Sequence, residues 1–108
     1  MKCKTEVLLM NGSMSVGQCT GCKRVGVHFN NLLAGFSQSE FKRWAEWLLH
    51  IEFAPNSSLF HDGQFCIILD TGKANLQFTF TESEFNVFRD GIAEALLQMR
   101  VRELMAGE

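Results

Sequence analysis

The sequence predicts an α+β fold, a two-layer sandwich in which two helices cover one face of an antiparallel sheet. Three observations favour it. The 108 residues are the usual length of one globular domain, and 46% of them are hydrophobic, which is enough for a core without disulfides or metal. Segments of alternating apolar residues are followed twice by a helix start. These two regions also resemble each other, which predicts an internal duplication within a single domain at 1–108.

The internal repeat relates residues 32–41 to residues 76–85, an offset of 76 − 32 = 44 positions. Leucine, serine, glutamate and two phenylalanines are identical at corresponding positions. Two copies are too few for a solenoid, so the repeat predicts a duplicated strand-pair-plus-helix unit. The half-repeats are expected at about 13–52 and 59–105. The alternative is that two strand-to-helix junctions converged on the same capping residues.

Strands are predicted where apolar residues alternate with polar or small ones, as is typical of half-buried strands. The Asn11-Gly12 pair and residues 70–73, Asp-Thr-Gly-Lys, are typical turn sequences between such segments. Antiparallel strands half-buried against helices build a two-layer structure. The strands are expected at 6–9, 14–18, 25–29, around Leu33, at 65–69 and at 76–80.

Two capping boxes mark the predicted helix starts. Ser37 and Thr81 are suited to N-cap positions, and Glu40 and Glu84 follow three residues later. In each box we expect the hydroxyl to accept from a first-turn amide and the carboxylate to accept from the amide of the cap. Apolar residues then recur at helical spacing. The helices are expected at 38–51 and 82–104.

The repeat also predicts a shared core. Phe36 and Trp44 of the first copy correspond to Phe80 and Phe88 of the second, and we expect all four rings to be buried together. Gly91 lies inside the second predicted helix, where glycine costs about 1 kcal/mol relative to alanine. Residues 54–58, Ala-Pro-Asn-Ser-Ser, are expected to form a linker between the two copies.

The charge and hydropathy of the chain exclude several classes of function. The formal net charge is −2, and the basic residues are scattered, so binding to nucleic acid or to an acidic membrane surface is not expected. No apolar run has the length of a signal peptide or a membrane span. The sequence therefore predicts a cytoplasmic protein, in which the four cysteines are thiols or metal ligands rather than disulfides.

Cys19 and Cys22 form a Cys-x-x-Cys turn between two predicted strands, and this is the one motif with possible chemistry. Two thiolates at this spacing can hold a tetrahedral metal ion, and zinc is the metal that suits such a site. The motif is half of a zinc site, because no second pair follows it. Cys3 is the first candidate for a third ligand, and His28 is the second.

Two other interpretations of this turn stay open. Cys19 and Cys22 are consistent with a small thiol-based redox protein, although strand-like residues follow them in place of the helix that lowers a thiol pKa in thioredoxins. They are also consistent with a tight turn in which cysteine serves as a small hydrophobe, and this interpretation is favoured over the redox one. Cys66 alternates with apolar neighbours in a strand and is expected to be a packing residue.

No nucleophile, base and orienting group converge in the sequence, so it favours a binding or regulatory module over an enzyme, and we assign no catalytic or cofactor-binding residue. His61-Asp62 is interpreted as part of a loop. Trp47, Leu49 and Leu33 lie off the predicted buried faces. They predict a contact surface for a protein partner or for a second copy in a homodimer.

Several motifs together resemble a known family. Cys19-x-x-Cys22, the strand and turn at 25–33 and the helix start at 36–41 resemble a family of short uncharacterised bacterial proteins, found mainly in Bacteroidetes. Its pattern combines Cys-x-x-Cys, Phe-x-Asn-Leu-Leu and Ser/Thr-x-x-Glu-Phe. The family is expected to have glycine at x of the second motif, and this chain has Asn30 there. The resemblance implies a cytosolic protein of unknown function and adds no catalytic residue.

Overall fold

The fold is known from a computed structural model that describes residues 4–73 and 76–106. The molecule is elongated, measuring 50 × 26 × 25 Å. The first half of the chain contains β1 (Thr5–Asn11), β2 (Met14–Cys19), β3 (Val25–Phe29), β4 (Leu32–Phe36) and α1 (Gln38–Leu49). The second half contains α2 (Phe53–Asn56), β5 (Ser57–Leu59), β6 (Phe65–Asp70), β7 (Gln77–Phe80) and α3 (Glu82–Ala106).

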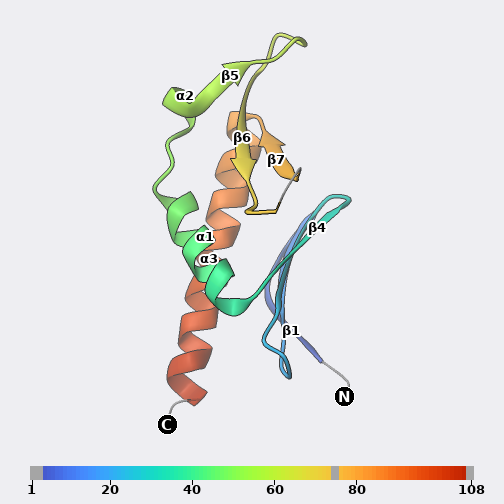
Figure 1. Cartoon of the computed structure of the whole chain (residues 1–108), viewed down its shortest axis with the longest axis vertical. Coiled ribbons are helices and arrows are strands. Elements are labelled where there is room, and N and C mark those ends of the chain that lie inside the picture. The colour runs from blue at the N-terminus through green and yellow to red at the C-terminus, as the bar shows by residue number, and fades with distance from the viewer. Residues whose placement is uncertain (1–3, 74–75, 107–108) are drawn as a thin grey trace.

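The predicted α+β class with antiparallel strands is confirmed, but the strands form two sheets in place of one. The first sheet has the order β1-β2-β3-β4, and the second has the order β5-β6-β7. All neighbouring strands are antiparallel. The 25 residues of α3 give it a length of about 37 Å, and it runs along both sheets, with the second sheet near its start and β1 near its end (Figure 1).

One core joins both sheets and both long helices. Phe36, Phe80, Trp44 and Phe88 are all buried in it, as the repeat predicted. The ring centroids of Phe80 and Phe88 lie 4.6 Å apart, and those of Trp44 and Phe88 lie 6.0 Å apart. Phe29 connects the two sheets through an edge-to-face contact with Phe80 at 5.1 Å. The duplication itself stays a prediction.

Both helices begin at the predicted caps, with one difference in hydrogen bonding. At α1 the Ser37 hydroxyl accepts from the Glu40 amide at 3.2 Å, and the Ser37 amide donates to the Glu40 carboxylate at 2.8 Å. At α3 the Thr81 amide donates to the Glu84 carboxylate at 2.9 Å, but the Thr81 hydroxyl also donates to that carboxylate, at 3.1 Å. The predicted hydroxyl-accepting cap is therefore present at α1 only.

The segment expected to be a linker has regular structure. Residues 54–58 contribute to the short helix α2 and to strand β5. No apolar alternation predicts β5, because its sequence is Ser-Ser-Leu; the strand forms by pairing with β6. None of the described helices combines the length and the apolar character that a membrane span requires.

Candidate functional site

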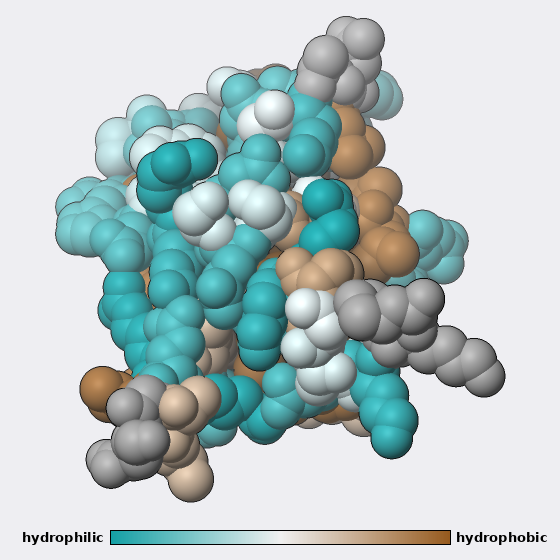
Figure 2. Space-filling model, turned by 60° about the horizontal axis from the view of Figure 1, so that its bottom comes forward, coloured by the Kyte–Doolittle hydropathy of each residue, from teal (hydrophilic) through white to brown (hydrophobic). Residues whose placement is uncertain are grey.

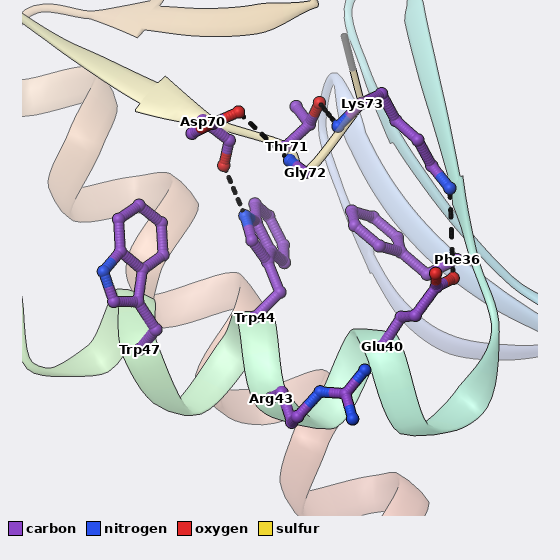
Figure 3. A pocket seen from close by; sticks show the side chains of 9 residues that line it. All are labelled: Phe36, Glu40, Arg43, Trp44, Trp47, Asp70, Thr71, Gly72 and Lys73. Atoms are coloured by element: carbon purple, nitrogen blue, oxygen red, sulfur yellow. Dashed lines mark hydrogen bonds and ion pairs between the residues drawn. The ribbon is translucent and has the colours of Figure 1, made fainter.

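A pocket lies between α1 and the turn that joins β6 to β7, and we call it the α1 pocket (Figure 3). Its cavity measures about 520 Å³. The first helix supplies one wall, and the turn supplies the opposite wall. The residues that line it are Phe36, Glu40, Arg43, Trp44, Trp47, Asp70, Thr71, Gly72 and Lys73.

The wall formed by α1 follows from helical spacing. Glu40, Arg43, Trp44 and Trp47 are three or four residues apart, so their side chains share one face of the helix. The Trp44 indole is fixed, because its Nε1 donates to the Asp70 carbonyl at 2.8 Å. Trp44 is 8% exposed, whereas Trp47, one turn further on, is 46% exposed. The pocket therefore has a fixed aromatic wall next to an open aromatic ring.

Stacking on the core holds this wall from behind. The rings of Phe36 and Trp44 are stacked, with centroids 4.9 Å apart and planes 26° from parallel. Phe36 ends β4, so the pocket is connected directly to the first sheet. Burial of both rings is expected to make the wall rigid.

The turn that forms the other wall is held by its own side chains. The Gly72 amide donates to the Asp70 carboxylate at 3.1 Å, and the Lys73 amide donates to the Thr71 hydroxyl at 3.2 Å. Thr71 is buried, and its hydroxyl donates to the Leu76 carbonyl at 2.7 Å. Gly72 has φ +80°, a left-handed conformation that glycine adopts without steric cost.

The charges of the α1 pocket fall into two groups. The Glu40 carboxylate is bound by the Ser37 amide and lies 3.9 Å from the Lys73 ammonium. The hydrogen bond from the Ser37 amide lowers the pKa of Glu40, and Lys73, the Ser37 hydroxyl and Arg24 lower it further. Arg43, in contrast, is exposed and forms no hydrogen bond or ion pair with any residue that the structure describes.

The residues predicted to bind a metal lie in the first sheet, outside the α1 pocket. Cys19 and Cys22 form the turn between β2 and β3, where the Cys22 amide donates to the Cys19 sulfur at 3.4 Å. His28 is exposed on β3, and Cys3 lies outside the described residues. Within the described ranges no three His, Cys, Asp or Glu side chains are placed to hold a metal ion. His28 is thus not brought together with both cysteines. Cys19 is disulfide-bonded, so the expectation that the cysteines are thiols or metal ligands rather than disulfides is wrong for this residue. Zinc at this turn stays a prediction.

The thiol positions agree with the interpretation of Cys66 as a packing residue. Cys66 is buried in β6, and burial raises the pKa of its thiol, with Asp62 and Glu84 raising it further. The turn at Cys19 and Cys22 leads into β3, so no helix N-terminus follows it. The structural basis for an activated thioredoxin-like thiol is therefore missing from this turn.

The residues predicted to form a contact surface are not brought together. Trp47 lines the α1 pocket, and Leu49 is half-buried against the core. Leu33 lies on the face of the first sheet that points away from the core, where it lines a hollow of about 310 Å³. Figure 2 shows hydrophobic side chains gathered on the right, the side on which the first sheet lies in Figure 1. A protein partner or a second copy stays a prediction.

Sequence reasoning missed the α1 pocket. Arg43 and Trp47 gave a signal that was available, because an arginine and a tryptophan four residues apart share a helix face. Lys73 and Thr71 gave none, since they were interpreted as parts of a turn. Only the folded chain brings that turn to α1.

The fold and the pocket define the class of this protein, a small α+β protein with a ligand-sized pocket between a helix and a β-turn. Residues 1–90 match the sequence pattern of a family of unknown function, DUF6686. The match covers well over half of the chain, and the chain belongs to this family. The expectation of an uncharacterised family is therefore confirmed. No curated protein and no solved structure matches the chain.

Proposed function

We propose that this protein is a non-enzymatic binding module of the cytoplasm and that the α1 pocket holds its ligand. The observation that supports this proposal is the exposed Trp47 ring beside a rigid wall formed by Trp44. A cavity of about 520 Å³ is in the size range of pockets for small molecules. A few polar groups around an aromatic wall are also typical of such sites.

The polar groups of the pocket favour binding over catalysis. The Thr71 hydroxyl is engaged with the Leu76 carbonyl, and the Glu40 carboxylate is engaged with the cap of α1. The Asp70 carboxylate accepts from the Gly72 amide. These contacts hold the helix start and the turn in place, so these groups are structural supports of the pocket. A catalytic base or nucleophile needs a partner that orients it toward substrate, and the described residues of this pocket do not offer one.

A ligand in the α1 pocket would contact both half-repeats, because Trp47 belongs to the first and Lys73 to the second. Binding to the folded chain alone stabilises it by mass action. A ligand should therefore raise the melting temperature as well as occupy the pocket. A module whose folded state is stabilised by its ligand can act in regulation, because the amount of folded protein then depends on the ligand concentration.

The fluorescence of the protein itself offers a test. The chain has two tryptophans and no tyrosine, and both tryptophans line the α1 pocket. The probe is N-phenyl-1-naphthylamine (NPN), a neutral aromatic amine that fluoresces in apolar surroundings and accepts energy from tryptophan. We expect NPN to quench tryptophan emission in a saturable way and to raise the melting temperature.

The matched variants are Trp47→Leu and Phe65→Leu. Each replaces one exposed aromatic ring, but Phe65 lies on β6 outside the pocket. Trp47→Leu should weaken NPN binding by about tenfold, the effect of losing roughly 1.4 kcal/mol of contact. Phe65→Leu should leave the affinity unchanged. Equal affinity in the wild type and Trp47→Leu, or no saturable binding to the wild type, contradicts the proposal.

The alternative is a small redox protein that uses Cys19 and Cys22. It has less support, because the turn leads into a strand. Titration of accessible thiols with and without a chelator separates the hypotheses for this turn. Thiols exposed only by the chelator favour bound zinc, and a pair that reacts rapidly below neutral pH favours redox chemistry.

A further inference from the structure

The charged side chains of the α1 pocket differ in what they are already bound to. Both carboxylates accept hydrogen bonds from backbone amides, Glu40 from Ser37 and Asp70 from Gly72. Lys73 lies within ion-pair distance of Glu40. Arg43 alone among the charged residues of the pocket has no such contact with the described part of the chain. The pocket therefore contains one guanidinium that is available to a ligand.

The Arg43 side chain lies along α1, the helix that supplies one wall of the pocket. Figure 3 shows its side chain extending along α1 toward Glu40, away from the ring of Trp47. No cation–π contact joins Arg43 to either tryptophan in the described residues; the one found there joins Arg89 to Phe85. The exposed face of Trp47 is thus not covered by the nearest cation on its own helix.

The two features lie one helical turn apart. Arg43 and Trp47 are separated by four residues, and neighbouring side chains at this spacing have Cβ atoms about 6 Å apart. A planar ring that rests on Trp47 can present an acidic substituent to Arg43 once the arginine side chain, which extends toward Glu40, rotates toward Trp47. A guanidinium binds a carboxylate, sulfonate or phosphate through two parallel hydrogen bonds.

We propose that the ligand of the α1 pocket is a small aromatic acid, whose ring packs against Trp47 and whose anionic group binds Arg43. This inference rests on the proposed function, and it names the class of ligand. Lys73 adds a second positive charge at the rim, partly offset by Glu40. Arg43 is the residue that selects an acid over a neutral aromatic compound.

The test compares two probes that differ by one anionic group. 8-Anilinonaphthalene-1-sulfonate (ANS) is NPN with a sulfonate added. We expect ANS to bind the wild type about tenfold more tightly than NPN, as one charge-assisted hydrogen-bonded contact provides. The affinity for ANS should fall with added salt, and the affinity for NPN should not.

Substitutions of Arg43 locate the source of the preference. Arg43→Gln should lower the affinity for ANS about tenfold and leave the affinity for NPN unchanged. Arg43→Lys keeps the positive charge but lacks the planar guanidinium, so its affinity for ANS should be about threefold lower than that of the wild type. The control, Arg89→Gln, removes a guanidinium from α3 and should change neither affinity. Because Arg43 is exposed and without partners in the described residues, Arg43→Gln should melt at the wild-type temperature.

Competition with ANS tests whether a carboxylate is bound as well as a sulfonate. 1-Naphthoate should displace ANS from the wild type, and the neutral 1-naphthalenemethanol should displace it at least several-fold less well. Equal binding of ANS and NPN, or a preference for ANS that survives in Arg43→Gln, overturns the inference and leaves the proposed function intact. Failure of both probes to bind overturns both.

Discussion

The two long helices both begin after a strand and a capping residue, but their surfaces are packed against different parts of the molecule. At the repeat offset, Trp47 of α1 corresponds to Gly91 of α3, since 47 + 44 = 91. Trp47 is 46% exposed in the α1 pocket, whereas Gly91 is buried under the first two strands. A Cβ atom at Gly91 would lie 2.6 Å from the Met14 sulfur and 2.8 Å from Leu9 Cδ2. The two positions related by this offset thus differ in burial, since Trp47 is exposed on α1 and Gly91 is buried on α3.

In the second sheet β5 pairs with β6 as β2 pairs with β3 in the first, so the described second sheet has a counterpart of β2 but none of β1. The difference comes from β1 and β2. They pack on α3 and leave no room for a side chain at Gly91. Glycine was expected to lower the stability of this helix. In the structure, the absence of a side chain at Gly91 allows Met14 to pack closely against the helix. On α1 the surface around Trp47 faces the turn at residues 70–73, and the α1 pocket lies between them. At this position α1 therefore borders a pocket, whereas α3 is packed against the first sheet.

The largest predicted effect concerns what the two copies share. Phe36→Ala and Phe80→Ala each remove a ring that is 2% exposed, and each should lower the free energy of unfolding by about 3–5 kcal/mol. Because one core contains both rings, both variants should unfold in a single transition in urea. Two separate transitions, or a loss below about 1 kcal/mol in either variant, would contradict a shared core.

The next prediction exchanges the residue at the position where the copies differ. Gly91→Leu should cost about 1–3 kcal/mol, because its side chain has no space beside Met14 and Leu9. Trp47→Leu, at the corresponding position of α1, should change stability by less than about 0.5 kcal/mol. Urea midpoints of the two variants provide the measurement. Similar losses in both would show that the two positions are equally buried, against this comparison.

Local signals predicted most of the fold. The helix starts after Ser37 and Thr81 and the turn at 70–73 were predicted correctly, because they depend on neighbours within a few residues, although the Thr81 hydroxyl donates to Glu84 in place of accepting from the helix. The division into two sheets was not predicted. It depends on where the chain lies along α3 when β5 begins, after α1 and α2. The alternation of apolar residues within a strand does not indicate this position.

The candidate site was predicted poorly for the same reason. Cys19 and Cys22 form a recognisable motif, but the spacing of two cysteines does not predict a third metal ligand, whose position depends on the fold. The α1 pocket has no motif, because Trp47 and Lys73 come from segments that only tertiary packing brings together. The exposed Trp47 was recognised as lying off the buried face, but its surroundings were not predictable.

The two caps allow a finer comparison of the copies. Ser37→Ala removes an acceptor for the Glu40 amide and should cost about 1 kcal/mol. Thr81→Ala removes a hydroxyl that donates to Glu84, while the bond from the Thr81 amide to that carboxylate remains, so it should cost about 0.5 kcal/mol. Urea unfolding of both variants measures the difference. A larger loss at Thr81 would mean that its hydroxyl accepts from the helix after all.

The smallest effect is a pH dependence that links the cap of α1 to the pocket. The pKa of Glu40 is held below its ordinary value of 4.5 by the Ser37 amide, and then by Lys73. Since the folded chain binds this proton less readily than the unfolded chain, ionised Glu40 stabilises the fold fully above about pH 4.5. That contribution is lost as the pH falls through the lowered folded pKa.

Glu40→Gln should therefore be less stable than the wild type near neutral pH, and the difference should shrink as the pH falls below about 4.5. Urea midpoints of both proteins between neutral pH and about pH 3 measure it. The control is Lys73→Gln, which keeps the cap but removes the ammonium 3.9 Å from the carboxylate, and the pH-dependent part should be reduced in it. A difference between Glu40→Gln and the wild type that stays constant across this range would mean that Glu40 acts on stability through hydrogen-bond geometry alone.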